Sequence, residues 1–190
     1  MWWPDPTEAF SRFARGAAIL VLAGSAGGCF QPLYGEHPAA GAAGPGLRAA
    51  LSRVAVQQID ALKGSDEARL AVEIRNALIF DLTGGGEPLP PAYRLNIRMS
   101  TTSADIIVDT TTTRPAIENY GINATYTLVE IATGNAVVNG QTFARVSYDI
   151  PGQEQRFARL RGLRDAESRA AKTVADNIRT RLASYFAAGT

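Results

Sequence analysis

The sequence has few of the residues from which most catalytic and metal sites are built. Its 190 residues include one cysteine and one histidine, so an internal disulfide is excluded. The histidine, His37, lies in a stretch of glycine, alanine and proline, where a base is not held rigidly. A metal site needs several converging ligands, and Asp105 and Asp109 have no third acidic residue near them in the sequence. We therefore expect no enzymatic activity, no cofactor and no metal ion.

An excess of charge of either sign is also missing. Lysine and arginine total 19, aspartate and glutamate total 18, and the net charge is +1. This balance provides no basic field for nucleic acid, so we expect no nucleic-acid partner. The 46% of hydrophobic residues is typical of a globular protein, and the length suffices for one domain with a core.

No hydrophobic run near the N-terminus is long enough to span a bilayer, which takes about 20 apolar residues. Arg12 and Arg15 precede a short apolar run, residues 17–24, and small residues follow it. A basic segment, a short apolar segment and small residues in this order are typical of a secretory signal. We predict that residues 1–28 are a signal peptide.

The single cysteine, Cys29, directly follows Ala26-Gly27-Gly28. Small residues before a cysteine at this place indicate lipoprotein processing, in which the thiol takes a diacylglycerol and the chain gains acyl groups such as palmitate. Ala26 stands where such signals usually carry leucine, and an unmodified cysteine after an ordinary cleavage site is the alternative. Residues 29–46 are rich in glycine, alanine and proline and are predicted to be a lipidated tether. Residues 47–190 are predicted to form a single domain.

The first half of this domain predicts a strand and a helix. Val54 to Ile59 has the composition of a strand. Ser65 can cap a helix, whose apolar residues then recur at helical spacing, and Gly84 to Gly86 can end it. A phosphate-binding reading of the three glycines fails, because no Gly-Lys-Ser/Thr follows them.

The second half predicts a sheet and a long helix. Apolar and polar residues alternate in 93–100, 117–131 and 136–150, with a hairpin turn at 132–135. The segment 103–109, with Ile106-Ile107-Val108, either continues the first of these strands or forms a bulge in it. A helix is predicted from about Glu154 to Phe186, because its apolar residues fall three or four apart. The expected fold class is α+β, a two-layer sandwich in which a mostly antiparallel four-stranded sheet carries two helices on one face.

The other face of this sheet is predicted to be polar and able to lie against a polar partner. Arg94, Arg98, Arg114 and Arg145 are candidates for contacts with phosphates or with carboxylates of a partner protein, because guanidinium binds both in bidentate fashion. The alternative is that each is a solvated strand residue.

Several segments resemble one known family. Cys29-Phe30-Gln31-Pro32-Leu33-Tyr34-Gly35 is similar to the start of mature LptE lipoproteins of alphaproteobacteria, which often have one more glycine after the cysteine. The likeness continues through most of the mature chain, in the segments 69–82, 93–95, 124–128, 132–134, 147–148, 164–167 and 178–182.

The resemblance implies a lipoprotein anchored by lipid to the periplasmic side of the outer membrane. It implies a plug inside the LptD β-barrel that assists barrel folding and the delivery of lipopolysaccharide to the cell surface, a role in membrane biogenesis. LptD, lipopolysaccharide and the membrane would then be its partners. One alternative is an auxiliary ligand-binding lipoprotein of an envelope transport system, which requires an apolar pocket between sheet and helices. A structural spacer or an inhibitor is the other.

Overall fold

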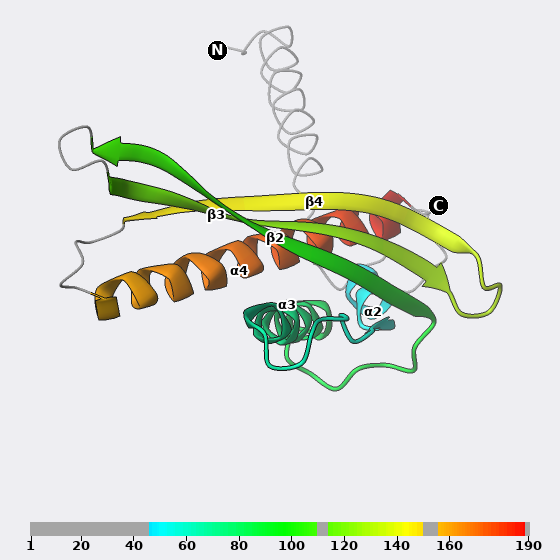
Figure 1. Ribbon diagram of the computed structural model, residues 1–190. Helices are drawn as coiled ribbons and strands as arrows, with labels where there is room; N and C mark the ends of the chain where they lie inside the picture. The colour runs from blue at the N-terminus through cyan, green and yellow to red at the C-terminus, as the bar shows by residue number, and fades with distance from the viewer. Residues whose placement is uncertain (1–45, 110–113, 150–155, 189–190) are drawn as a thin grey trace, which may run out of the picture. The chain divides into compact units, whose positions relative to one another are not determined.

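Three long strands and two long helices make up most of the chain for which a computed structural model describes the structure, residues 46–109, 114–149 and 156–188 (Figure 1). These residues belong to one of the two compact units of the chain, Glu36–Thr190. The elements in chain order are α2 (Leu47–Leu51), β1 (Val54–Val56), α3 (Asp66–Thr83), β2 (Tyr93–Asp109), β3 (Arg114–Glu130), β4 (Ala136–Asp149) and α4 (Arg156–Ala188). The predicted signal peptide, Cys29, His37 and all of the tether except Gly46 lie outside the described residues.

The sheet has the strand order β1-β2-β3-β4. β2 pairs with β3 and β3 pairs with β4, both antiparallel, whereas β1 runs parallel to β2. The predicted four-stranded, mostly antiparallel sheet is confirmed. β1 is shorter than predicted, because its pairing ends at Val56 with Leu95 and only one further bond, from the Gln57 amide to the Leu95 carbonyl (2.9 Å), extends it.

The segments 93–100 and 103–109 form one strand, β2, rather than two. Its register with β3 shifts twice between Asp105 and Val108. A β-bulge of this kind adds a residue to one strand and bends it without ending the pairing. Periodicity alone left open whether the second segment continues the strand or bulges, and both occur.

The helix α3 begins and ends where the sequence predicts. The Ser65 hydroxyl accepts a hydrogen bond from the Ala68 amide (3.2 Å), and Asp66 and Glu67 lie in the first turn, where the helix dipole favours acids. Gly84 follows the last turn with φ of 65°, a left-handed conformation that glycine adopts without steric cost.

The helix α4 confirms the predicted long C-terminal helix, whose described part begins at Arg156. The rings of Phe186 and Tyr93 meet edge-on near its C-terminal end, with centroids 5.1 Å apart. The short helix α2 was not predicted. It buries Ala50 and Leu51, and a helix of this length has too few residues to show a period.

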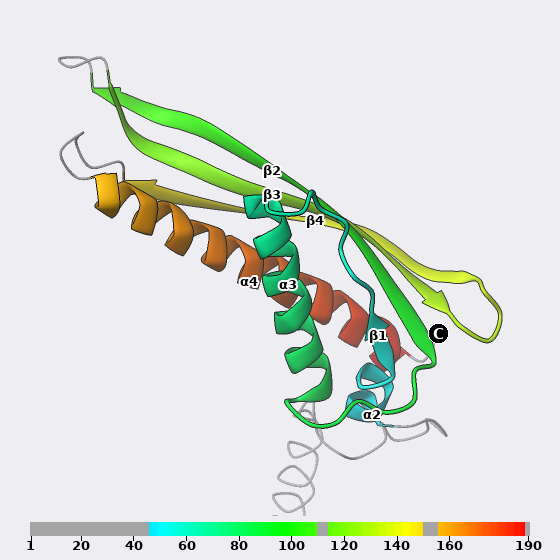
Figure 2. The same ribbon diagram turned by 60° about the horizontal axis from the view of Figure 1, so that its bottom comes forward.

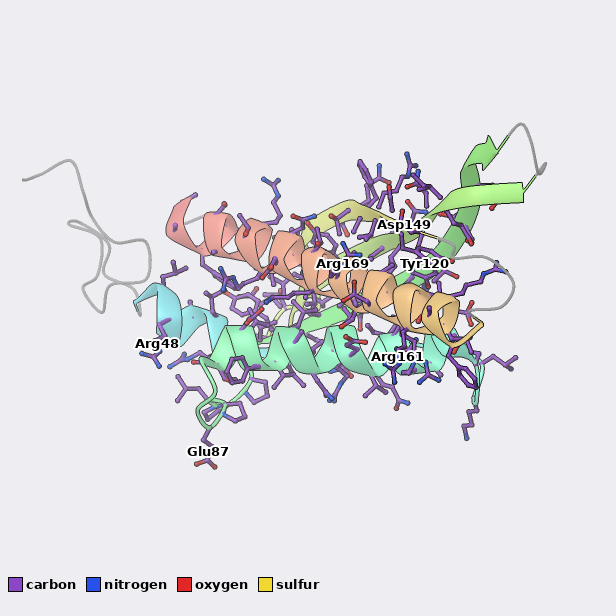
Figure 3. All side chains as sticks on the ribbon, turned by 90° about the vertical axis from the view of Figure 1, so that its left-hand side faces the viewer. Arg48, Glu87, Tyr120, Asp149, Arg161 and Arg169 are labelled. Atoms are coloured by element: carbon purple, nitrogen blue, oxygen red, sulfur yellow. The ribbon has the colours of Figure 1, made fainter. Side chains whose placement is uncertain are left out.

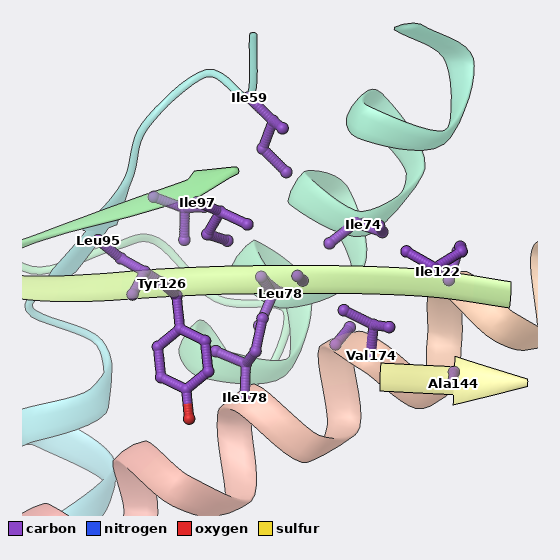
Figure 4. Packing of buried hydrophobic residues seen from close by; sticks show 14 of the residues in the cluster. Ile59, Ile74, Leu78, Leu95, Ile97, Ile122, Tyr126, Ala144, Val174 and Ile178 are labelled. Atoms are coloured by element: carbon purple, nitrogen blue, oxygen red, sulfur yellow. The ribbon is translucent and has the colours of Figure 1, made fainter. Parts of the chain in front are cut away.

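Both long helices cover the same face of the sheet (Figures 1 and 2). The largest fully buried side chains come from all three sources, the two helices and the sheet (Figure 4). They are Leu70, Ile74, Leu78 and Leu82 of α3, Leu95, Ile122 and Leu128 of the strands, and Val174, Ile178 and Leu182 of α4. Burying such a side chain contributes about 1.5–3 kcal/mol, so this layer dominates the stability of the fold. The predicted two-layer α+β sandwich is confirmed.

Candidate functional site: the open face of the sheet

The sheet face that the helices leave uncovered carries mainly polar side chains. We call it the open face. Pairing register and alternation assign to it Arg94, Asn96, Arg98, Ser100, Thr102, Ala104, Asn119, Gly121, Asn123, Thr125, Thr127, Val129, Asn139, Gln141, Phe143, Arg145 and Ser147. Because neighbouring residues of a strand point to opposite faces, the same alternation that buries Ile122 and Ala124 exposes Asn123 and Thr125.

Hydrogen bonds between strands order part of this face. The Thr127 hydroxyl donates to the Asn139 side-chain carbonyl at 2.9 Å, and the Ser147 hydroxyl donates to that of Asn119 at 2.6 Å. These pairs join β3 to β4 at two places along the strands. They keep the amide groups in defined positions, so the open face offers a pre-ordered set of donors and acceptors.

A shallow pocket of about 370 Å³ lies in the middle of the open face. It is lined by Arg98, Met99, Ser100, Asn123, Ala124, Thr125, Gln141, Thr142 and Phe143. The lining residues form three successive rows across β2, β3 and β4, and in the first of these rows Thr125 pairs with Arg98 on one side and with Gln141 on the other. Most of its side chains can form hydrogen bonds. An auxiliary ligand-binding lipoprotein was expected to have an apolar pocket between sheet and helices, and this pocket is of a different kind.

The exposed aromatic residue of the open face is Phe143, which sequence reasoning missed. Its side chain is 66% exposed although its neighbours on this face are polar. A signal was present in the sequence. If Ala144, Val146 and Tyr148 face the core, then Phe143 must share the other face with Arg145.

Three of the four predicted arginines lie exposed on the open face. Arg98 lines the pocket, Arg94 lies opposite Val129, and Arg145 lies opposite Gly121. No carboxylate among the described residues forms a salt bridge with any of these three. They do not form one cluster, because Arg98 and Arg145 lie on β2 and β4 with β3 between them.

The fourth predicted arginine, Arg114, begins β3, and its side chain is outside the described part. That any of the four contacts a phosphate or a partner carboxylate stays a prediction.

The covered side of the sheet contains one buried carboxylate and one partly buried carboxylate, and the first joins the helices. Glu167 of α4 is 3% exposed and pairs with Arg69 of α3, which also lies 3.7 Å from Glu73. Burial raises the pKa of Glu167, because it disfavours the charged carboxylate more than Arg69 favours it. Figure 3 shows the two helices side by side. Burial, and Glu167 after it, raises the pKa of the nearby Tyr120 to about 12.

The second carboxylate, Glu118, lies where α4 begins to cover the sheet. It accepts hydrogen bonds from the hydroxyls of Ser103 and Tyr148, the latter at 2.7 Å, and Arg159 of α4 lies 3.6 Å away. Burial is the largest single influence on the pKa of Glu118 and raises it. The hydrogen bonds and Arg159 together outweigh burial, so the pKa lies below its usual value. Neither carboxylate faces the open side, so both belong to the fold rather than to the candidate site.

Residues 46–109, 114–149 and 156–188 contain no group of three or more His, Cys, Asp or Glu that is arranged to hold a metal ion. Within the same ranges, every helix is too short or too polar to cross a bilayer.

Several solved structures are similar to this chain. A protein of Caulobacter crescentus CB15 that has been described as a lipoprotein is 23% identical, with a TM-score of 0.55 over 76% of this chain and 98% of that one. Rare lipoprotein B of Shewanella oneidensis is 13% identical, with a TM-score of 0.49 over 69% of this chain and 92% of that one. A minor lipoprotein of Acinetobacter baumannii is 12% identical, with a TM-score of 0.48 over 70% and 92%. The first likeness supports the fold alone.

No protein of curated function matches the chain significantly in sequence. The family model LptE, described as lipopolysaccharide-assembly, matches residues 51–182, from the end of α2 to the last turns of α4. The match spans well over half of the chain and includes every strand and the whole core layer. The resemblance that the sequence suggested is thereby confirmed, and the chain belongs to the LptE family of lipopolysaccharide-assembly lipoproteins.

Proposed function

We propose that this protein is an outer-membrane lipoprotein that plugs an LptD-type β-barrel and assists its folding and its delivery of lipopolysaccharide. The observation that carries the proposal is the open face, a sheet surface of hydroxyls, amides and three arginines that no described carboxylate pairs with. Burial of a polar face of this kind yields little binding free energy through exclusion of water alone. Binding is favourable when the partner surface offers matching donors, acceptors and carboxylates.

The lumen of a large outer-membrane barrel is such a surface. Its inward-facing side chains are polar, because apolar residues are placed on the lipid side of each strand. Uncharged amides such as Asn123 and Gln141 can exchange water for wall hydrogen bonds at little net cost, and Arg98 or Arg145 can pair with wall carboxylates. The same arginines can bind phosphates of lipopolysaccharide during its passage. Binding and positioning, without catalysis, are sufficient for this role.

The anchor completes the proposal. Removal of residues 1–28 would leave Cys29 as the first residue. A diacylglycerol on its thiol and palmitate on its amino group would then hold the chain at the periplasmic side of the outer membrane. A flexible linker with as many residues as the segment 29–46 would have a root-mean-square span of about 23 Å. That reach allows the folded domain to enter a barrel while its acyl groups stay in the inner leaflet.

The proposal is tested by measuring the barrel and the surface lipopolysaccharide in cells in which the protein is depleted or altered. Depletion should reduce both surface lipopolysaccharide and the amount of folded barrel. In purification from detergent extracts, wild-type protein should bring the barrel with it, and Arg98→Glu combined with Gln141→Glu should lose most of it, because both charges enter the same row of the pocket. Lys172→Glu, on the exposed side of α4, is the control and should retain the barrel. A wild-type protein that is extracted without any barrel would overturn the proposal.

A further inference from the structure

The outer edge of β4 has no strand beside it among the described residues. β4 is the last strand in the sheet order, and its described partner is β3 alone. From Val138 to Asp149 its register with β3 runs without a shift. Outside this ladder, no backbone hydrogen bond joins β4 to a described residue. Every second residue of β4 therefore directs its amide and carbonyl away from the sheet, as an edge strand must.

From Val138 to Asp149 this edge has few of the features by which proteins usually block strand pairing. Such features are charged side chains, above all lysine, prolines, bulges, very short edge strands and a covering helix or loop. The long strand β4 (Ala136–Asp149) contains neither proline nor lysine, its register shift with β3 lies before Val138, and its charged residues are Arg145 and Asp149. The helix α4 packs against the covered face of β4, where the Asn177 amide donates to the Thr142 hydroxyl (3.0 Å). At the opposite edge of the sheet, β1 pairs with Tyr93–Leu95 of β2.

The exposed Phe143 lies on this edge strand. A strand added beside β4 would place a side chain about 5 Å from Phe143, Cβ to Cβ, and would cover a ring that is now 66% exposed. Arg145 lies two residues further on the same face and would meet the next side chain of the added strand. The edge therefore favours a segment with an apolar residue against Phe143 and an acidic or amide residue against Arg145.

A second copy of this chain suits the edge less well than an extended segment does. Neighbouring strands lie about 4.8 Å apart, whereas packed helices need about 8–10 Å between their axes. Pairing of β4 with β4 of another copy would bring two α4 helices beside each other under the joined sheet, because α4 packs on both β4 and β3. An extended segment with no helix behind it meets no such constraint. The wall strands of a closed barrel are already paired on both sides, so in a barrel partner only a loop that folds into the lumen can supply it.

We propose that the outer edge of β4 pairs, strand to strand, with an extended luminal loop segment of the barrel partner, and that Phe143 anchors this segment. The inference rests on the proposed function. It adds a backbone-to-backbone contact to the side-chain contacts of the open face.

Hydrogen exchange at single-residue resolution tests the pairing directly. Full-length protein purified alone should show rapid exchange at alternate amides between Val138 and Tyr148. In the co-purified complex with the barrel, those same amides should exchange at least about tenfold more slowly, since each gains a hydrogen bond. A complex in which they stay as fast as in the free protein overturns this inference and leaves the proposed function standing. Absence of any complex overturns both.

Matched variants give a second readout. Phe143→Ala should lower the yield of co-purified barrel several-fold at an unchanged melting temperature, and Phe157→Ala, at a phenylalanine of α4 that is 81% exposed, should not. Proline at Gln141 or at Thr142 removes one amide in each case, and the two amides point to opposite sides of β4. The proline that removes an amide pointing away from the sheet should leave the melting temperature unchanged and lose the barrel. The proline that removes an amide bonded to β3 should lower the melting temperature. If neither Phe143→Ala nor the proline variant of unchanged stability affects the yield, the inference is wrong.

Discussion

The covered face and the open face of the same three strands present opposite chemistry. On β3, Ile122 and Ala124 are 0% and 1% exposed, while Asn123 between them is exposed to solvent. Because successive side chains of a strand point to opposite faces, the same strand supplies apolar side chains to the core and polar side chains to the solvent. A slip of one residue in register would bury Asn123 and expose Ile122, so the core also holds the open face in its orientation. The difference teaches that stability is concentrated on one face, which leaves the other free to be selected for binding.

The largest expected effect is on the covered face. Ile122→Ala should lower the free energy of unfolding by about 3–4 kcal/mol, because it removes buried methyl groups and leaves a cavity among fully buried neighbours. Asn123→Ala, one residue along and on the open face, should change it by less than about 0.5 kcal/mol. Urea unfolding followed by circular dichroism measures both. Equal losses from the two variants would contradict the division of roles between the faces.

Two glycines compare the covered face with the open face through losses of stability of intermediate size. A Cβ at Gly140 would lie 2.5 Å from the ring of Tyr126, which is buried on the covered face, so Gly140→Ala should cost about 1–3 kcal/mol. A Cβ at Gly121 would lie 2.6 Å from the hydroxyl of Thr102, on the open face. That side chain is exposed and can rotate away, so Gly121→Ala should cost less than about 1 kcal/mol. Thermal unfolding of the two variants compares them, and a more damaging Gly121→Ala would show that the open face is as rigid as the core.

The smallest expected effect concerns Glu118, a carboxylate on the covered side. Its pKa in the folded protein lies below the usual 4.5, so its charged form stabilises the fold above that pH, and this contribution is lost as pH falls through the folded pKa. Glu118→Gln should therefore cost about 1 kcal/mol at pH 7 and progressively less in acid. Denaturant unfolding at a series of pH values measures this dependence.

Glu167→Gln is the matched control for this pH dependence. Burial raises the pKa of Glu167, so its contribution to stability is greatest below the usual 4.5 and declines as pH rises through the folded pKa. Relative to wild type, Glu167→Gln should become more favourable as pH rises, whereas Glu118→Gln should become less favourable. Parallel trends in the two variants would show that these pKa directions are wrong.

Local patterns were enough to predict most of the fold. The Ser65 cap, the left-handed Gly84 and the alternation in 93–100 each depend on a few neighbouring residues, and the structure has them as predicted. The two faces of the sheet followed from the same alternation. The short helix α2 and the early end of β1 did not follow, because one turn of helix and three strand residues are too short to show a period.

The sequence by itself determined which side chains share a face, because period two in a strand and 3.6 in a helix are properties of a single segment. Only the tertiary structure decided which distant residues meet. It placed Glu167 beside Arg69 and Glu118 beside Tyr148, set Arg98 in one row with Gln141, and made β4 the last strand of the described sheet. Strand order and register depend on how whole elements pack against each other, and no local period encodes that.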